Sequence, residues 1–115
     1  MLFGILFINL HNDILKERMQ IIKTEPILLF SAKHPNSISA FADWVFKTNK
    51  ANWSNFKDVK QTFNSVDSVG NDRYVFNIKG NQFRIVAMIF FIPKLVYIRF
   101  VGTHSEYDKI DCVNI

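Results

Sequence analysis

The sequence predicts an α+β fold in which N-terminal helices pack on a mainly antiparallel, twisted β-sheet, followed by a short C-terminal helical segment. Apolar residues recur at helical spacing upstream of Ser65, and from Val69 onward they alternate with polar ones, as in strands. Two turn signals, Gly80-Asn81 and Pro93-Lys94, divide the alternating stretch into consecutive hairpins. With 115 residues, 49% of them hydrophobic, the chain has room and apolar material for one compact domain.

The N-terminal stretch fits poorly with the rest, because a strand-like segment begins afresh at Met19. We expect residues 1–18 to be an N-terminal extension or the product of a mis-assigned start codon, and residues 19–115 to form the domain. The tripeptide KER just before Met19 can be encoded by a purine-rich stretch of the kind that serves as a bacterial ribosome-binding site. The alternative is a real arm or strand that packs Leu6 and Ile8 on the domain.

The opening MLFGILFINL is apolar for only ten residues, lacks a positive n-region and has no small-residue cleavage site. Neither a membrane span nor a secretory signal is therefore predicted. Cys112 is the only cysteine, which leaves no intrachain disulfide and no cysteine cluster for zinc. We expect a protein of the reducing cytoplasm without membrane association.

Three helices are predicted between the first strand and the sheet. Gln20 to Lys23 form a short strand, and Thr24 caps a helix from Glu25 to Lys33 with Pro26 in its first turn. Asn36 or Ser37 caps the second helix and Ser54 the third. The side chains expected to face the core are Ile38, Phe41, Ala42, Val45 and Phe46 of the second helix, and Phe56, Val59 and Phe63 of the third.

The first hairpin has a two-residue connection, Gly80-Asn81, which places Ile78 opposite Phe83. Residues opposite one another share a face of the sheet. The apolar face then holds Tyr74, Phe76, Ile78, Phe83, Ile85 and Ala87, and the polar face holds Arg73, Asn77, Lys79, Gln82 and Arg84.

The second hairpin is expected to keep the same parity. An even loop places Ile98 and Phe100 on the apolar face and Tyr97 and Arg99 on the polar one, whereas an odd loop would bury Arg99. The sheet arginines then share one side, and the net charge of +4 and pI near 9.3 also favour a polyanionic partner. The alternative is an ordinary sheet with one solvated face.

The segment after the last strand carries groups suited to proton transfer. If it forms a helical turn capped by Thr103 or Ser105, then His104, Tyr107 and Asp108 share one side of that turn. RNA cleavage by its own 2′-hydroxyl needs a proton acceptor, a proton donor and positive charge at the phosphate, with no obligatory metal. No P-loop, dinucleotide-binding fingerprint, HExxH or GxSxG motif occurs, so no cofactor and no metal site are predicted.

The stretches FKDVKQTF, VGNDRYVFNIKGNQFRIVAMIFF and YIRFVGTHSEYDKID resemble the HigB-type toxins of bacterial type II toxin–antitoxin systems, members of the RelE-like superfamily. The resemblance runs from Met19 to the last residue. It implies a RelE-like microbial RNase fold and an mRNA interferase, an endoribonuclease that cuts mRNA on the ribosome. It also implies neutralisation by a helix-turn-helix, HigA-like antitoxin within a toxin–antitoxin hetero-oligomer.

The resemblance also implies roles for individual residues. In the family's THxEYD pattern the matching positions are His104, Glu106, Tyr107 and Asp108, and the basic sheet positions match Arg73, Lys79, Arg84 and Arg99. We expect His104 to transfer protons, Tyr107 to stack or donate a proton, Asp108 to orient the imidazole, and Arg84 and Arg99 to bind the scissile phosphate. The flanking RNA would be bound by Lys57, Arg73, Lys79, Gln82 and Glu106.

Two alternatives remain open from the sequence. One is a non-catalytic RNA- or ribosome-binding module that uses the same basic face of the sheet. The other is a protein-interaction domain, suggested by the twelve phenylalanines, with its function in a hydrophobic groove. His104 and its neighbours separate the catalytic reading from the first alternative.

Overall fold

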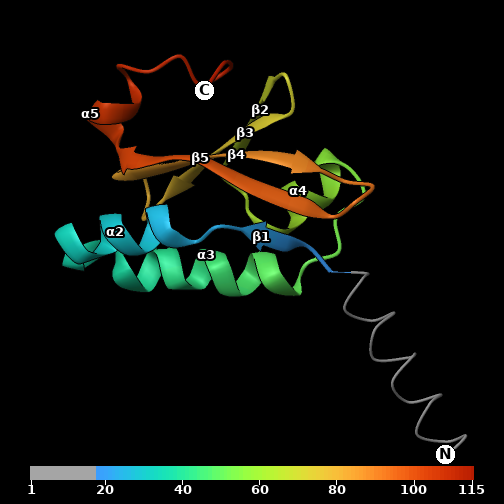
Figure 1. Cartoon of the computed structure of the whole chain (residues 1–115), viewed down its shortest axis with the longest axis horizontal. Coiled ribbons are helices and arrows are strands. Elements are labelled where there is room, and N and C mark those ends of the chain that lie inside the picture. Colours follow the sequence, from blue (N-terminus) through green and yellow to red (C-terminus); the bar gives the residue numbers. More distant parts are fainter. Residues whose placement is uncertain (1–17) are drawn as a thin grey trace, which may run out of the picture.

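The computed structural model describes residues 18–115, and it consists of helices and one five-stranded sheet (Figure 1). The strands are β1 (Gln20–Ile22), β2 (Val66–Gly70), β3 (Arg73–Ile78), β4 (Phe83–Phe90) and β5 (Leu95–Thr103). The helices are α2 (Glu25–Lys33), the 3-10 helix η1 (Pro35–Ser37), α3 (Ile38–Lys50), α4 (Phe56–Thr62) and α5 (His104–Tyr107). This confirms the α+β prediction, while the expected arm with Leu6 and Ile8 lies outside the described residues.

The sheet has the strand order β1-β5-β4-β3-β2. β1 pairs with β5 in parallel, and the other neighbours are antiparallel. In Figure 1, α2 and α3 lie below the sheet, whereas α5 and the C-terminal residues lie above it. Within residues 18–115, no helix combines the length and the apolar character that crossing a membrane requires.

The first hairpin has the predicted register. Ile78 pairs with Phe83 and Asn77 pairs with Arg84, so alternate residues of both strands point to the helices. All six residues predicted for the apolar face are buried: Tyr74, Phe76, Ile78, Phe83, Ile85 and Ala87. The alternation of apolar and polar residues was sufficient to predict this register because one face of the hairpin is fully covered.

Aromatic side chains from the helices fill the space over that face. Trp44 of α3 contacts Phe76 edge-on, with ring centroids 5.3 Å apart, and stacks on Phe63 at 6.2 Å. Phe41 packs against Phe83 at 5.8 Å. Such offset and edge-on aromatic pairs combine large apolar burial with favourable ring electrostatics, so they attach α3 firmly to the sheet.

The expected core stripe of α3 was wrong in part. Phe41 is buried, but Ile38 and Phe46 are 51% and 58% exposed, and the other buried positions are Trp44 and Thr48. The indole of Trp44 buries more surface than Ile38 or Phe46 could, so the helix is rotated to place it inward. The third helix also begins one residue later than expected, because the side chain of Asn55, not Ser54, accepts the N–H of Asp58.

The second hairpin keeps the expected parity only in its first half. Phe90 pairs with Leu95 and Ala87 pairs with Ile98, but a β-bulge follows, so that Val86 pairs with Phe100. A bulge sets two residues of one strand against one of the other. Phe100 is therefore on the face opposite the helices, contrary to the prediction, and Val101 packs against the core instead.

The second face of the sheet is not an open cationic surface. Val75 and Val86 are buried, and so are Arg73 and Arg84, which are 8% and 5% exposed. The C-terminal residues fold back to this face: Asn71 Nδ2 donates to the main-chain oxygen of Val113 at 3.0 Å. The expectation of a solvated, arginine-rich face failed because residues beyond the last strand cover it.

Candidate active site

The short helix α5 starts where β5 ends, and a capping box fixes its first turn. Glu106 N–H donates to the hydroxyl of Thr103 at 3.1 Å, and Thr103 N–H donates to Oε1 of Glu106 at 2.8 Å. The hydrogen bond from the Thr103 backbone lowers the pKa of the Glu106 carboxyl. His104 N–H donates to the carbonyl of Gln82 at 2.9 Å, which ties the helix to the β3–β4 turn. Glu106, expected to bind RNA, thus holds the turn that presents His104.

Arg84 is buried beneath this turn, and both of its terminal nitrogens are fully engaged. Nη1 donates to the carbonyls of Asn81 and Phe83, each at 3.1 Å. Nη2 donates to Oδ1 of Asn81 and to Nδ1 of His104, each at 2.7 Å. A guanidinium nitrogen of this kind carries two hydrogens, so neither retains a donor for a phosphate in this arrangement.

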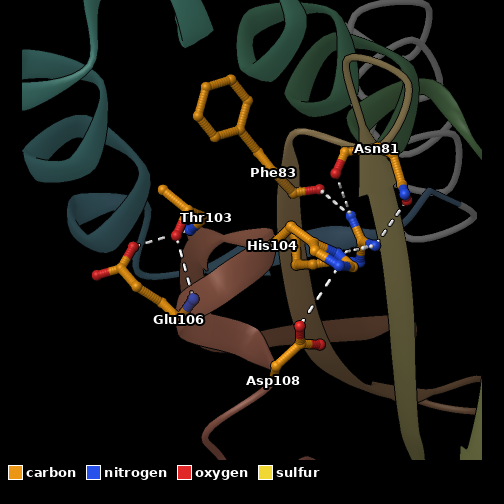
Figure 2. A network of polar contacts seen from close by, with 7 residues as sticks. Asn81, Phe83, Thr103, His104, Glu106 and Asp108 are labelled. Carbon is orange, nitrogen blue, oxygen red and sulfur yellow. Dashed lines mark hydrogen bonds and ion pairs between the residues drawn. The ribbon is translucent and has the colours of Figure 1, made fainter.

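His104 contacts Arg84 through one ring nitrogen and Asp108 through the other. Figure 2 labels His104 and Asp108 and marks the contact between them. Its Nε2 is 3.4 Å from Oδ2 of Asp108, and the two side chains are 47% and 58% exposed. Because a guanidinium can only donate, Nδ1 of His104 must accept, and the proton of the neutral imidazole is then on Nε2. The contact with Arg84 therefore sets which nitrogen of His104 can donate.

Tyr107 packs against the other side of this cluster. Its ring centroid is 5.6 Å from Cζ of Arg84, and its hydroxyl donates to Sγ of Cys112 at 3.5 Å. Burial, followed by the hydrogen bond to Cys112, raises the pKa of Tyr107 to about 12. Tyr107 is thus protonated at neutral pH and sits against the positive charge of Arg84.

Arg99 is the sheet arginine that faces solvent. It lies at the bulge of β5, between Ile98, which pairs with Ala87, and Phe100, which pairs with Val86. Among residues 18–115, no hydrogen bond or ion pair engages its guanidinium. Its donors are free for a phosphate, whereas the hydrogens on Nη1 and Nη2 of Arg84 are not.

Close packing of the backbone positions the residues beside Arg99. Gly102 pairs with Arg84, and a Cβ atom at Gly102 would overlap the ring of Phe100. The ring therefore lies over the Gly102 backbone, where any larger residue would displace it. No pattern in the sequence indicates this contact.

The remaining predicted RNA-binding residues do not gather around His104. Lys57 is exposed on α4, at the opposite end of the sheet from α5 (Figure 1). Nζ of Lys79 donates to the carbonyl of Asn36 at 2.9 Å. Arg73 donates to the main-chain oxygens of Asn71 and Ile115. Of this set, Gln82 and Glu106 touch the α5 turn, and both contacts are structural.

Two residues of the cluster were missed from the sequence. Asn81 was interpreted only as a turn former, yet it supplies two acceptors to Arg84. Cys112 was considered only for disulfide and zinc chemistry, yet it binds the Tyr107 hydroxyl. The position of Asn81 three residues before Arg84 was the only signal available. Within the described part of the chain, no three His, Cys, Asp or Glu side chains cluster closely enough to hold a metal ion.

Comparison with known proteins places the chain in a family. Residues 37–110 match the model of the HigB toxin family, described as the RelE-like toxic component of a toxin–antitoxin system. The chain belongs to the HigB toxin family. The matched region runs from the end of η1 through α5, and it includes Asn81, Arg84, Arg99, His104 and Asp108.

Individual relatives of this HigB family member are similar over different lengths. The mRNA interferase toxin HigB of Escherichia coli K12 is 43% identical over 60 residues, which cover 50% of this chain and 58% of that protein. The mRNA interferase HigB of Escherichia coli O6:H1 is 28% identical over 94 residues, which cover 80% of this chain and 91% of that protein. The first alignment thus spans little more than half of the relative.

Proposed function

We propose that this chain is an mRNA interferase, an endoribonuclease toxin that cleaves messenger RNA on the ribosome. Membership of the HigB toxin family and the names of its relatives support this assignment. The observation that carries it is the hydrogen bond from Arg84 to His104 together with the 3.4 Å contact between His104 and Asp108, whose side chains are both exposed. A ribose-phosphate linkage could therefore reach these two side chains from solvent.

The cleavage step uses the neighbouring 2′-hydroxyl of the message. A bond forms from O2′ to phosphorus, the bond from phosphorus to O5′ breaks, and a 2′,3′-cyclic phosphate and a 5′-hydroxyl result. The carboxylate of Asp108 accepts the proton of the 2′-hydroxyl and returns it to O5′. No metal is needed for this proton transfer.

His104 and Arg99 stabilise the charge that develops on the phosphate. A neutral imidazole with its proton on Nε2 is a hydrogen-bond donor, and it would form imidazolate if it gave that proton away. His104 therefore donates a hydrogen bond to a phosphate oxygen, while Asp108 transfers the proton. Arg99 adds a positive charge with free donors. Tyr107 offers its ring as a stacking surface beside Arg84.

Substitutions of Asp108 and His104 test this division of roles. Asp108→Asn removes the proton acceptor, so ribosome-dependent message cleavage should fall by about 100-fold or more. His104→Gln retains an N–H donor, so it should keep more activity than His104→Ala. The measurement is the rate of message cleavage by purified chain and ribosomes, followed by primer extension.

The matched control is Asp43→Asn, an exposed carboxylate on α3 that pairs with Lys47. It should leave the cleavage rate unchanged. Equal activity of Asp108→Asn and the parent chain would remove the proposed proton acceptor. Ribosome binding without cleavage by the parent chain would instead favour a non-catalytic RNA-binding module.

The partner in the cell is an antitoxin, since the family is the toxic component of a toxin–antitoxin system. We propose a helix-turn-helix, HigA-like protein that binds this chain in a hetero-oligomer in the cytoplasm, where ribosomes are. A co-expressed helix-turn-helix protein from the adjacent reading frame should restore growth and co-purify with the chain.

A further inference from the structure

The guanidinium group of Arg84 connects the β3–β4 turn to the α5 turn. Asn81 lies in that turn and binds Arg84 twice, through its main-chain oxygen on Nη1 and its side-chain Oδ1 on Nη2. The remaining hydrogen of Nη1 is taken by the carbonyl of Phe83, and that of Nη2 by His104. Figure 2 shows Asn81, Phe83 and His104, the three residues that supply these acceptors.

Asn81 determines where the last hydrogen of Nη2 points. A guanidinium is planar, so the four acceptors on Nη1 and Nη2 together fix the rotation of its plane. Two of these acceptors belong to Asn81 in the turn, and a third is the carbonyl of Phe83 at the start of β4. With Oδ1 of Asn81 occupying one hydrogen of Nη2, the other is directed at Nδ1 of His104.

The direction of that hydrogen has a chemical consequence. An imidazole nitrogen that accepts a hydrogen bond cannot carry the proton, so Arg84 excludes the tautomer with hydrogen on Nδ1. The proton is then on Nε2, which is 3.4 Å from Asp108. Enzymes that hold a histidine in one tautomer through its second nitrogen lose most of their rate when that partner is changed.

We propose that Asn81, acting through Arg84, is a positioning residue that confines the proton of neutral His104 to Nε2. The effect on RNA cleavage rests on the proposed function, whereas the tautomer itself does not. Among the described residues no hydrogen bond joins Asn81 to His104 directly, and the side chain that is bonded to both is that of Arg84.

The test is nitrogen NMR of the imidazoles in the full chain, at a pH where His104 is neutral. The parent chain should show His104 protonated on Nε2, with its signals assigned by their loss in His104→Ala. Asn81→Ala should give a mixture of both tautomers. Asn81→Asp retains an oxygen acceptor for Nη2, and it should restore the single tautomer. His34, which stacks on Phe30 at 4.1 Å, serves as an internal reference that should not change.

Cleavage kinetics provide the second measurement. Asn81→Ala should lower kcat by at least about tenfold and change KM less than twofold, because the affected donor acts on the reacting phosphate. Asn49→Ala, an exposed asparagine on α3, is the matched control and should leave both constants unchanged. Thermal unfolding of each variant shows whether the turn still folds.

The two proposals fail in different ways. A parent chain with the proton on Nδ1, or an Asn81→Ala variant that keeps one tautomer, overturns the positioning role whatever the cleavage rate. An Nε2 tautomer that depends on Asn81, in a chain that does not cleave RNA, supports the positioning role and overturns the proposed function.

Discussion

Both faces of the sheet carry buried side chains, but different kinds of interaction bury them. On the helix-covered face, apolar side chains such as Phe76 and Ile85 pack against an aromatic layer from α3 and α4. On the opposite face, Arg73 and Arg84 are covered by the α5 turn and the C-terminal residues, and each donates to specific oxygen or nitrogen atoms. Packing on the first face depends on the volume of the side chains, and packing on the second depends on the direction of hydrogen bonds.

This difference explains why one face supports the fold and the other the candidate chemistry. Dispersion and hydrophobic burial are non-directional, so the helix-covered face needs only apolar side chains of suitable size. A buried arginine must have nearly all its donors satisfied, which fixes the positions of its partners. His104 obtains its orientation from that requirement, through Arg84.

The largest effect on stability is expected on the helix-covered face. Phe76→Ala removes a ring that contacts Trp44 and Phe63, and the rigid layer around it cannot fully close the cavity. The free energy of unfolding should fall by about 3–5 kcal/mol, measured by urea denaturation. Phe76→Leu should recover most of it. A loss below about 1 kcal/mol would mean that this face is not tightly packed.

A smaller loss is expected when the directional face is broken. Arg84→Ala leaves the carbonyls of Asn81 and Phe83 without their donor, and should cost about 2 kcal/mol in the same measurement. Arg84→Lys keeps the charge but offers a single nitrogen, so its free energy of unfolding should lie between those of Arg84→Ala and the parent chain. If Arg84→Lys matched the parent chain, the fork of donors would not matter to the fold.

A third effect, confined to alkaline solution, is a pH dependence centred on Tyr107. Its folded pKa of about 12 lies above the ordinary tyrosine value of 10.0, so folding favours the protonated phenol. This contribution is complete below pH 10, where the unfolded chain is also protonated. It is lost as pH rises from 10 to about 12, and the free energy of unfolding should fall over that range.

Urea denaturation of Tyr107→Phe at several alkaline pH values checks this expectation. The variant should lose less stability between pH 10 and 12 than the parent chain does. Cys112→Ala should leave most of the shift, because burial is the larger cause and the hydrogen bond to Cys112 the second. Parallel pH curves for parent and Tyr107→Phe would show that Tyr107 titrates normally.

The parts of the fold that depend on local chemistry were predictable. The bounds of α2 and the pairing of Ile78 with Phe83 are as expected, although Thr24 makes no side-chain capping hydrogen bond and the strand at Gln20 ends one residue early, at Ile22. The turn of the chain that brings His104, Tyr107 and Asp108 together also follows from a capping signal and helical spacing. These features involve residues close to one another in the sequence.

Interactions between distant segments were not predictable in the same way. The bulge near Arg99 depends on how β4 and β5 fit together, and it moved Phe100 to the other face. The rotation of α3 depends on which of its side chains fills the space beside Phe63 and Phe76. No local pattern distinguishes Trp44 from Phe46 as the residue that faces inward.

The sequence alone determined the α+β class, the hairpin register and the set of residues available for chemistry, because these depend on periodicity, turn geometry and residue type. Only the tertiary structure decided that Arg84 is buried and bound to Asn81 and His104, whereas Arg99 is open to solvent. Both arginines were expected to face the same way. The residues that satisfy a guanidinium are assembled by folding, so residue type and parity cannot tell a structural arginine from one that is free to bind a phosphate.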